Sequence, residues 1–269
     1  MKRFLLAVAV ATSALFSGVA SAGPFILAGT DADDHGFANA FGNQDGWFFM
    51  QRALENLAAG VTTGNKKVTI LGSTGSSLAA ASSAFNLSSL VGLGWTLQTV
   101  STTNFGTFFV AGGNLGTGIL MMDSGGNVGG GVDGSAFVTH ASAINTFLGA
   151  GGSLFSQANG YDWLSALIPG LRDENESRQG LALTAAGNAA FPGLNNGDLS
   201  SGPYHNRFEN IGTLSVFATS TITSNNIIIG SAGGSITNPN PGRVPEPASL
   251  VLTGLALAAL RMTSKRKTD

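Results

Sequence analysis

Three residues of this chain have the types that nucleophilic catalysis requires. Ser156 follows a predicted strand, His205 lies near the end of the central part of the chain, and Glu209 comes four residues later. A serine becomes a nucleophile when a histidine takes its proton and a carboxylate orients that histidine. However, the segment Phe155-Ser-Gln-Ala-Asn-Gly160 lacks the G-x-S-x-G turn of serine hydrolases. We therefore expect no enzyme, with a secreted hydrolase or amidase-like activity through Ser156 and His205 as the alternative.

The densest group of metal-ligating side chains lies in a short polar loop. Asp31, Asp33, Asp34 and His35 follow a predicted first strand, and carboxylate oxygens are the ligands that Ca²⁺ prefers. The segment lacks the spacing of an EF-hand loop, and aspartates in loops also form local turns. We expect no cofactor, and keep a calcium-assisted adhesin as a further alternative.

The composition excludes several classes of protein. The chain of 269 residues has no Cys, so disulfides, thiolate metal sites and a cysteine nucleophile are excluded. Its 39 glycines follow no G-X-Y period, which excludes collagen. The part from Gly23 to Val244 holds 7 basic and 13 acidic residues, a net charge of about −6. Because phosphate recognition needs a basic face, we expect no nucleic-acid partner.

The first 22 residues have the pattern of a secretory signal peptide. Lys2 and Arg3 precede an apolar stretch from Phe4 to Phe16, and Ala20-Ser21-Ala22 supplies the small residues of a cleavage site. We therefore predict cleavage by signal peptidase between Ala22 and Gly23.

The last 26 residues also have three parts. Pro245, Glu246 and Pro247 precede an apolar run from Ala248 to Leu260 and a basic tail. At about 1.5 Å per residue, this helix-forming run spans roughly 20 Å, less than the roughly 30 Å hydrocarbon core, so it predicts only a short transmembrane helix. Positive charge holds such an end on the cytoplasmic side.

This order of triplet, apolar run and basic tail resembles the PEP-CTERM sorting signal of Gram-negative bacterial surface proteins. The resemblance implies processing by an exosortase, transfer from an inner-membrane-anchored intermediate to the cell surface or exterior, and association with exopolysaccharide or biofilm. Residues 231–243, rich in Gly, Ser, Asn and Pro, are predicted to be a linker to this segment, residues 244–269.

Residues 23–230 are predicted to be the secreted body, with strands alternating with helices. Helical spacing of apolar residues predicts helices at Trp47–Ala58 and Phe137–Leu148, and more weakly at Ser76–Phe85 and Tyr161–Ile168. Short apolar runs predict the strands, listed here: Phe25–Ala28, Val68–Leu71, Trp95–Val100, Thr107–Ala111, Ile119–Asp123, Ser153–Ser156, Leu214–Ala218 and Ile227–Ile229.

This alternation favours an α/β fold with a mostly parallel sheet and flanking helices, flavodoxin-like or amidotransferase-like. An all-β sandwich is the alternative. The helix, glycine turn and strand from Ile144 to Ser156 resemble the corresponding segment of class I glutamine-amidotransferase-like domains, as do the later stretches near Leu183, Phe191 and His205. The nucleophile of that family is a cysteine, which this chain lacks. The sequence thus predicts an exported, non-catalytic surface or matrix protein.

Overall fold

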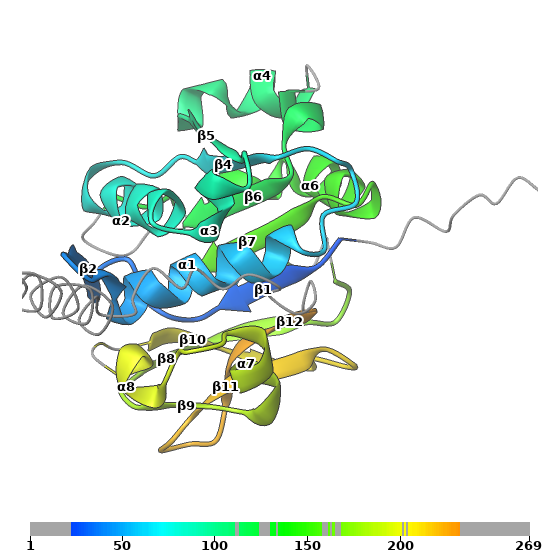
Figure 1. Cartoon of the computed structure of the whole chain (residues 1–269). Coiled ribbons are helices and arrows are strands. Elements are labelled where there is room, and N and C mark those ends of the chain that lie inside the picture. Colours follow the sequence, from blue (N-terminus) through cyan, green and yellow to red (C-terminus); the bar gives the residue numbers. More distant parts are fainter. Residues whose placement is uncertain are drawn as a thin grey trace, which may run out of the picture.

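The fold is built on a central sheet with helices on both faces (Figure 1). The computed structural model describes residues 23–110, 113–123, 130–132, 134–157, 161, 163–164, 168–200, 202 and 204–231. The predicted signal peptide, the sorting segment with Pro245, Glu246 and Pro247, and nearly all of the linker lie outside the described residues.

The strands are β1 (Phe25–Ala28), β2 (Gly36–Asn39), β3 (Gly42–Gln44), β4 (Lys67–Leu71), β5 (Thr96–Val100), β6 (Ile119–Asp123), β7 (Ser153–Gln157), β8 (Arg172–Arg178), β9 (Leu181–Leu183), β10 (Tyr204–Glu209), β11 (Ser215–Ser220) and β12 (Asn226–Ser231). The α-helices are α1 (Asp45–Ala58), α2 (Gly75–Asn86), α3 (Ser89–Gly92), α4 (Phe105–Val110), α5 (Ser135–Val138), α6 (Ala141–Gly149), α7 (Ala185–Ala190) and α8 (Asn196–Leu199). Two 3₁₀ turns, η1 (Thr102–Asn104) and η2 (Gly113–Gly116), flank α4.

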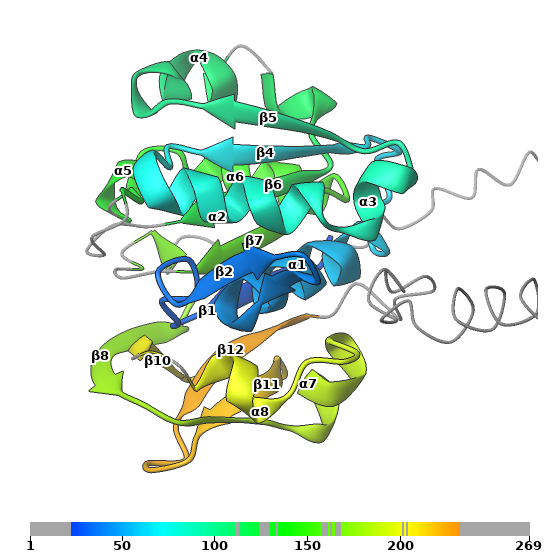
Figure 2. The ribbon, with the colours of Figure 1, turned by 60° about the vertical axis from the view of Figure 1, so that its left-hand side comes forward.

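Five parallel strands form one half of the sheet, in the order β5-β4-β6-β7-β1. The sheet continues through antiparallel pairs from β1 to β12, β10 and β8, while β11 and β9 extend it from β12 (Figure 2). Parallel strands need long crossover connections, which the helices between β1 and β7 supply. The predicted α/β class with a mostly parallel sheet and flanking helices is confirmed.

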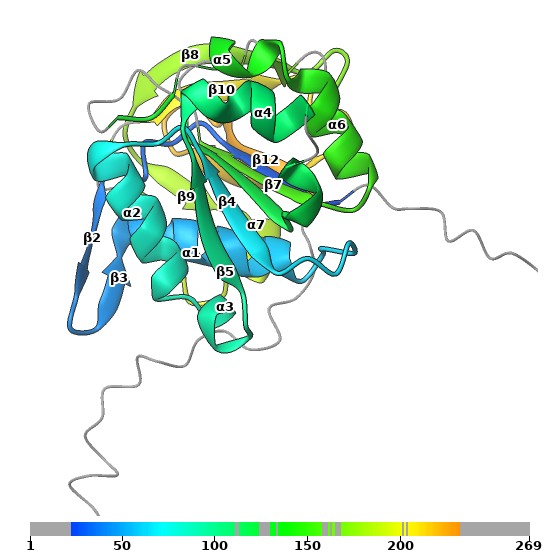
Figure 3. The ribbon, with the colours of Figure 1, turned by 90° about the horizontal axis from the view of Figure 1, so that it is seen from above.

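Each face of the sheet has its own apolar core. Alternate residues of β1 point to opposite faces, so Ile26 and Ala28 pack toward α1 and α2, whereas Leu27 packs toward α4 and α6. Seen from above, α1 and α2 lie on one side of the parallel strands and α4 and α6 on the other (Figure 3). Strands buried on both faces explain the continuous apolar runs that the sequence shows.

Helix α1 confirms the predicted helix at Trp47–Ala58 and is buried on more than one side. Met50 and Leu54 are fully buried, as the helical spacing predicts, and Phe49 is fully buried as well. Its polar residues are buried as well, because Arg52 Nη1 contacts Glu55 Oε2 at 2.6 Å and Glu55 Oε1 accepts the Ser89 backbone N–H at 2.8 Å. The ion pair thus lies within α1, and Glu55 links this helix to α3 through the Ser89 N–H.

Two predicted elements differ from the structure. The strand predicted at Thr107–Ala111 is wrong, because Phe105, Phe108 and Phe109 of α4 bury their rings at helical spacing. The helix predicted at Phe137–Leu148 is divided into α5 and α6 by a turn at residues 139–140, where the His140 ring stacks on Phe109 with centroids 4.8 Å apart. Half of the helix predicted at Tyr161–Ile168 lies outside the described residues.

Candidate polar site at the carboxyl end of strand β1

The candidate site begins where β1 ends and residues 29–35 leave the sheet. Gly29 accepts the backbone N–H of His205 at 2.7 Å, and Thr30 forms an isolated bridge with Tyr204. A Cβ on Gly29 would lie 2.0 Å from the Asn206 carbonyl oxygen, so only glycine allows β10 to approach this closely. This close approach brings the predicted His205 beside the predicted aspartate cluster.

Asp31 lies between two imidazoles. Its Oδ2 is 3.1 Å from His205 Nε2 and 3.4 Å from His35 Nε2, and its side chain is only 9% exposed. Its other oxygen, Oδ1, is buried and has no hydrogen-bond partner among the described residues. Asp31 is therefore the carboxylate that the structure places beside His205.

The negative charges of this loop favour the protonated imidazole. Contact with Asp31 raises the pKa of His205 above its ordinary value, burial opposes this shift, and the charges of Asp31, Asp33 and Asp34 add to the rise. The 3.1 Å contact is an ion pair without an aligned hydrogen bond, because His205 Nε2 has no hydrogen-bond partner of acceptable geometry in the described part of the chain.

Asp33 holds the loop against three other elements. Its Oδ2 accepts the Ser77 hydroxyl of α2 at 2.5 Å, its Oδ1 accepts the Gln157 amide of β7 at 3.0 Å, and its carbonyl accepts the Trp47 indole N–H of α1 at 2.8 Å. The Asp33 residue is 2% exposed. Both carboxylate oxygens are thus occupied by bonds within the protein.

The other two members of the predicted triad lie apart from His205. Ser156 is fully buried on the α4 and α6 face of the sheet, and its Oγ has no hydrogen-bond partner within the described residues. Glu209 accepts hydrogen bonds from Arg207 at 3.2 Å. Four residues of extended strand separate Glu209 from His205, a distance of roughly 13 Å at about 3.3 Å per residue. The structure does not bring Ser156, His205 and Glu209 together.

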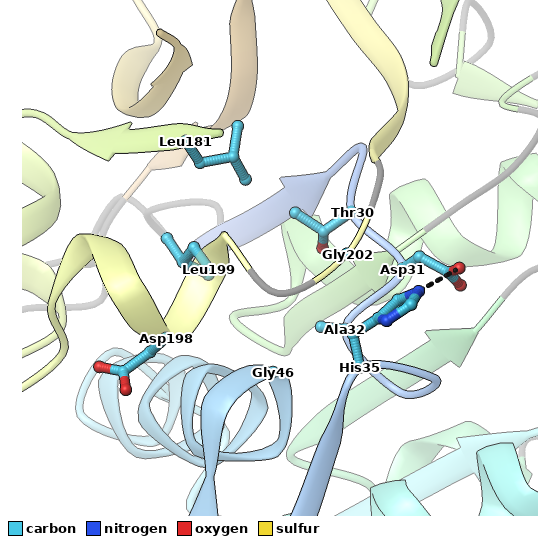
Figure 4. A pocket seen from close by; sticks show the side chains of 9 residues that line it. All are labelled: Thr30, Asp31, Ala32, His35, Gly46, Leu181, Asp198, Leu199 and Gly202. Atoms are coloured by element: carbon cyan, nitrogen blue, oxygen red, sulfur yellow. Dashed lines mark ion pairs between the residues drawn. The ribbon is translucent and has the colours of Figure 1, made fainter. Parts of the chain in front are cut away.

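A small cavity borders this cluster (Figure 4). Thr30, Asp31 and His35 line one part, and Leu181, Asp198 and Leu199 line another, with the His35 ring turned toward Asp31 (Figure 4). Its volume is about 10 Å³, about what one water molecule needs. Burial and the nearby charge of Asp45 raise the Asp198 pKa, while the Asn195 N–H opposes that shift.

The described residues do not supply a set of metal ligands around Asp31, Asp33 and Asp34. No group of three or more His, Asp or Glu residues in that part of the chain has an arrangement that could hold a metal ion. Asp33 is occupied by Ser77 and Gln157, and Asp34 lies half-buried beside it. A calcium-assisted adhesin stays a prediction, which a Ca²⁺ titration of Tm with Asp31→Ala would test.

Sequence reasoning missed the partners of the loop. Nothing in the sequence indicates that β10 lies beside the end of β1, so the pairing of Asp31 with His205 could not be predicted. Ser77 lies in a helix rich in Ser and Ala, and the sequence does not distinguish it from the other serines of that helix. Gln157 could have been recognised in the sequence as a candidate partner, because it is a polar residue that ends a buried strand.

Comparison of the chain with models of protein families, with curated proteins and with solved structures finds no match. Within the described residues, no helix has both the length and the apolar character needed to cross a membrane.

Proposed function

We propose that the chain is an exported bacterial surface or extracellular-matrix protein with a non-catalytic body. Export and sorting are supported by the two terminal segments, above all by the order of Pro245, Glu246 and Pro247, the apolar run and the basic tail. Signal peptidase, an exosortase and the inner membrane are its partners during transit, and extracellular polysaccharide is the proposed partner of the mature protein.

The proposal of a non-catalytic body rests on one observation: several of its reactive side chains are bound to other residues or buried. Asp33 binds Ser77 and Gln157, Glu209 binds Arg207, and Ser156 is fully buried. The cavity beside Asp31 has room for about one water molecule. The Asp33 contacts hold the loop to the sheet, and the small cavity leaves little space for a substrate beside Asp31, which supports a structural or binding role.

Mass spectrometry of the protein from its native host tests the export and sorting proposal. The mature chain should begin at Gly23 and should lack the residues after the Pro245-Glu246-Pro247 region. An intact C-terminus on the cell-surface protein would overturn the sorting proposal. Binding to purified exopolysaccharide, compared with a protein-free and a heat-unfolded control, tests the proposed partner of the body.

One observation favours a second function, a secreted hydrolase. The Asp31 carboxylate lies beside His205, and such a carboxylate orients a general-base imidazole and stabilises the imidazolium that forms when it takes a proton. Its test is hydrolysis of a panel of ester and amide substrates by the secreted protein, with Ser156→Ala and His205→Gln as matched variants. Activity that His205→Gln abolishes would contradict the non-catalytic body, and Ser156→Ala then decides whether this serine is the nucleophile.

A further inference from the structure

A second, larger cavity lies at the opposite end of β1. Its volume is about 350 Å³, within the range of roughly 300–1,000 Å³ that ligand pockets have. Apolar side chains from β1, β7 and α6 form its walls together with Leu164 and Ile168. The lining residues are Gly23, Phe25, Leu27, Asn145, Leu148, Gly149, Leu154, Leu164, Ile168 and Ser231.

None of the lining side chains carries a charge, and the predicted cleavage before Gly23 would add one α-ammonium group at the backbone. An ion would lose its hydration there without gaining a charged partner, whereas apolar groups gain about 25 cal/mol for each Å² removed from water. The polar side chains of the lining are Asn145, which is exposed, and Ser231, whose Oγ accepts the Phe25 backbone N–H at 3.2 Å. The cavity thus suits an uncharged, apolar occupant.

Both ends of the described chain lie at this cavity. Gly23 and Ser231 are among its lining residues, and Phe25 pairs with Ser231 in the sheet. The uncharged run Ala248–Leu260 begins 17 residues after Ser231. A coil of that length has an r.m.s. span of roughly 23 Å, and short tethers give effective concentrations of about millimolar. A free apolar molecule has no such tether.

We propose that this cavity receives apolar side chains of the chain's own segment Ala248–Leu260 before the segment enters a membrane. The cavity is too small for a whole helix, so it holds a few side chains from one face of the run. The inference goes beyond export and sorting, because it holds whether or not an exosortase later cleaves the segment. Docking would remove part of the apolar run from water.

Disulfide trapping in the full-length chain tests this docking. The natural chain has no cysteine, so every disulfide comes from the engineered pair. Asn145→Cys, at an exposed lining position, is combined in turn with Val251→Cys, Leu252→Cys and Leu255→Cys. Asn104→Cys is the matched control, because Asn104 is equally an exposed asparagine but follows β5 at the other end of the parallel strands. Oxidation of dilute protein in detergent-free buffer should trap the Asn145 pairs at least fivefold more than the Asn104 pairs.

A blocking variant sharpens the same experiment. Gly149 lines the cavity, and a Cβ built on it meets no atom within 4 Å, so Gly149→Leu adds an apolar side chain at the cavity wall without a clash of its Cβ. Trapping through Asn145→Cys should then fall severalfold. Equal trapping at both asparagines, no trapping, or disulfides only between two copies would each overturn the proposal. A lipid found in the cavity by native mass spectrometry, together with absent trapping, would assign it to a separate ligand.

Discussion

The two ends of β1 differ in chemistry and in available space. At the carboxyl end, Asp31 contacts two histidines, and Asp31 and His35 help to line a cavity that has room for about one water molecule. At the amino end, Phe25 and Leu27 help to line a cavity of about 350 Å³ without a charged residue. The end that holds the reactive residue types has little space, and the end with space has no such chemistry.

Residue type alone therefore does not locate a binding site in this protein. A buried carboxylate is stable when it is paired or hydrogen-bonded, and Asp33 meets that need through Ser77 and Gln157. An apolar wall needs no hydrogen-bond partner, so a cavity beside it leaves no polar group unsatisfied. The polar cluster is thus explained by the attachment of the loop to the sheet, while the apolar cavity is unfilled by the described residues.

The largest expected effect comes from removing the attachment at Asp33. Asp33→Ala leaves the buried Ser77 hydroxyl and the Gln157 amide without their acceptor, and each unsatisfied group costs about 1–3 kcal/mol. The free energy of unfolding should fall by about 3 kcal/mol in a urea titration. Asp34→Ala is the matched control at a half-buried position, and an equal loss there would contradict the role of Asp33.

A medium effect is expected from removing the ion pair between His205 and Asp31, and the size of this effect depends on pH. Because Asp31 raises the His205 pKa in the folded protein, the stabilisation is full below the unfolded pKa of about 6.5 and is lost as pH rises through the folded value. His205→Gln should therefore lower Tm more at pH 5.5 than at pH 9. In unfolding free energy, the extra loss at pH 5.5 should be up to about 1 kcal/mol.

The groups around His205 supply the control for that pH series. His35 also contacts Asp31, and Asp33 and Asp34 act on His205 through their charges. Asp31→Asn should remove most of the pH-dependent difference between wild type and His205→Gln. A difference that persists in the Asp31→Asn background would assign the effect to other groups.

The smallest expected effect comes from filling the apolar cavity. Gly149→Leu and Gly106→Leu both replace a helical glycine whose added Cβ meets no atom within 4 Å, but only Gly149 lines the cavity. Both glycines lie in terminal turns of their helices, so each variant gains less helix propensity than the about 1 kcal/mol of a helix interior. Gly149→Leu should gain roughly 0.5–1 kcal/mol more by burying its side chain, and equal Tm values for the two variants would show that the cavity is not filled.

The sequence was sufficient for the α/β class because buried parallel strands and amphipathic helices leave local patterns. Met50 and Leu54 marked α1, and the apolar run at Ile119–Asp123 marked β6. Strand β8 was missed, since its sequence RDENESR is charged and its pairing with β10 is not encoded locally. The α4 segment was misassigned because phenylalanines at helical spacing also fit a short strand.

The site was only partly predictable for the same reason. The cluster of Asp31, Asp33 and Asp34 with His35 is local, and the sequence identified it. Its partners His205 and Gln157 lie more than 120 residues away in the chain, so only the assembled sheet brings them to the loop. Glu209 lay near His205 in sequence, but an extended strand separates them in space.

The pairing of β1 with β12 also has a consequence for the order of assembly. Phe25, among the first described residues, pairs with Ser231, the last, so one side of β1 stays without its strand until nearly the whole body has been synthesised. Contacts this distant in sequence form slowly, because a long loop must close before they add stability. Within the described residues, the side of β1 that faces β12 is therefore completed only after nearly all of them have been synthesised.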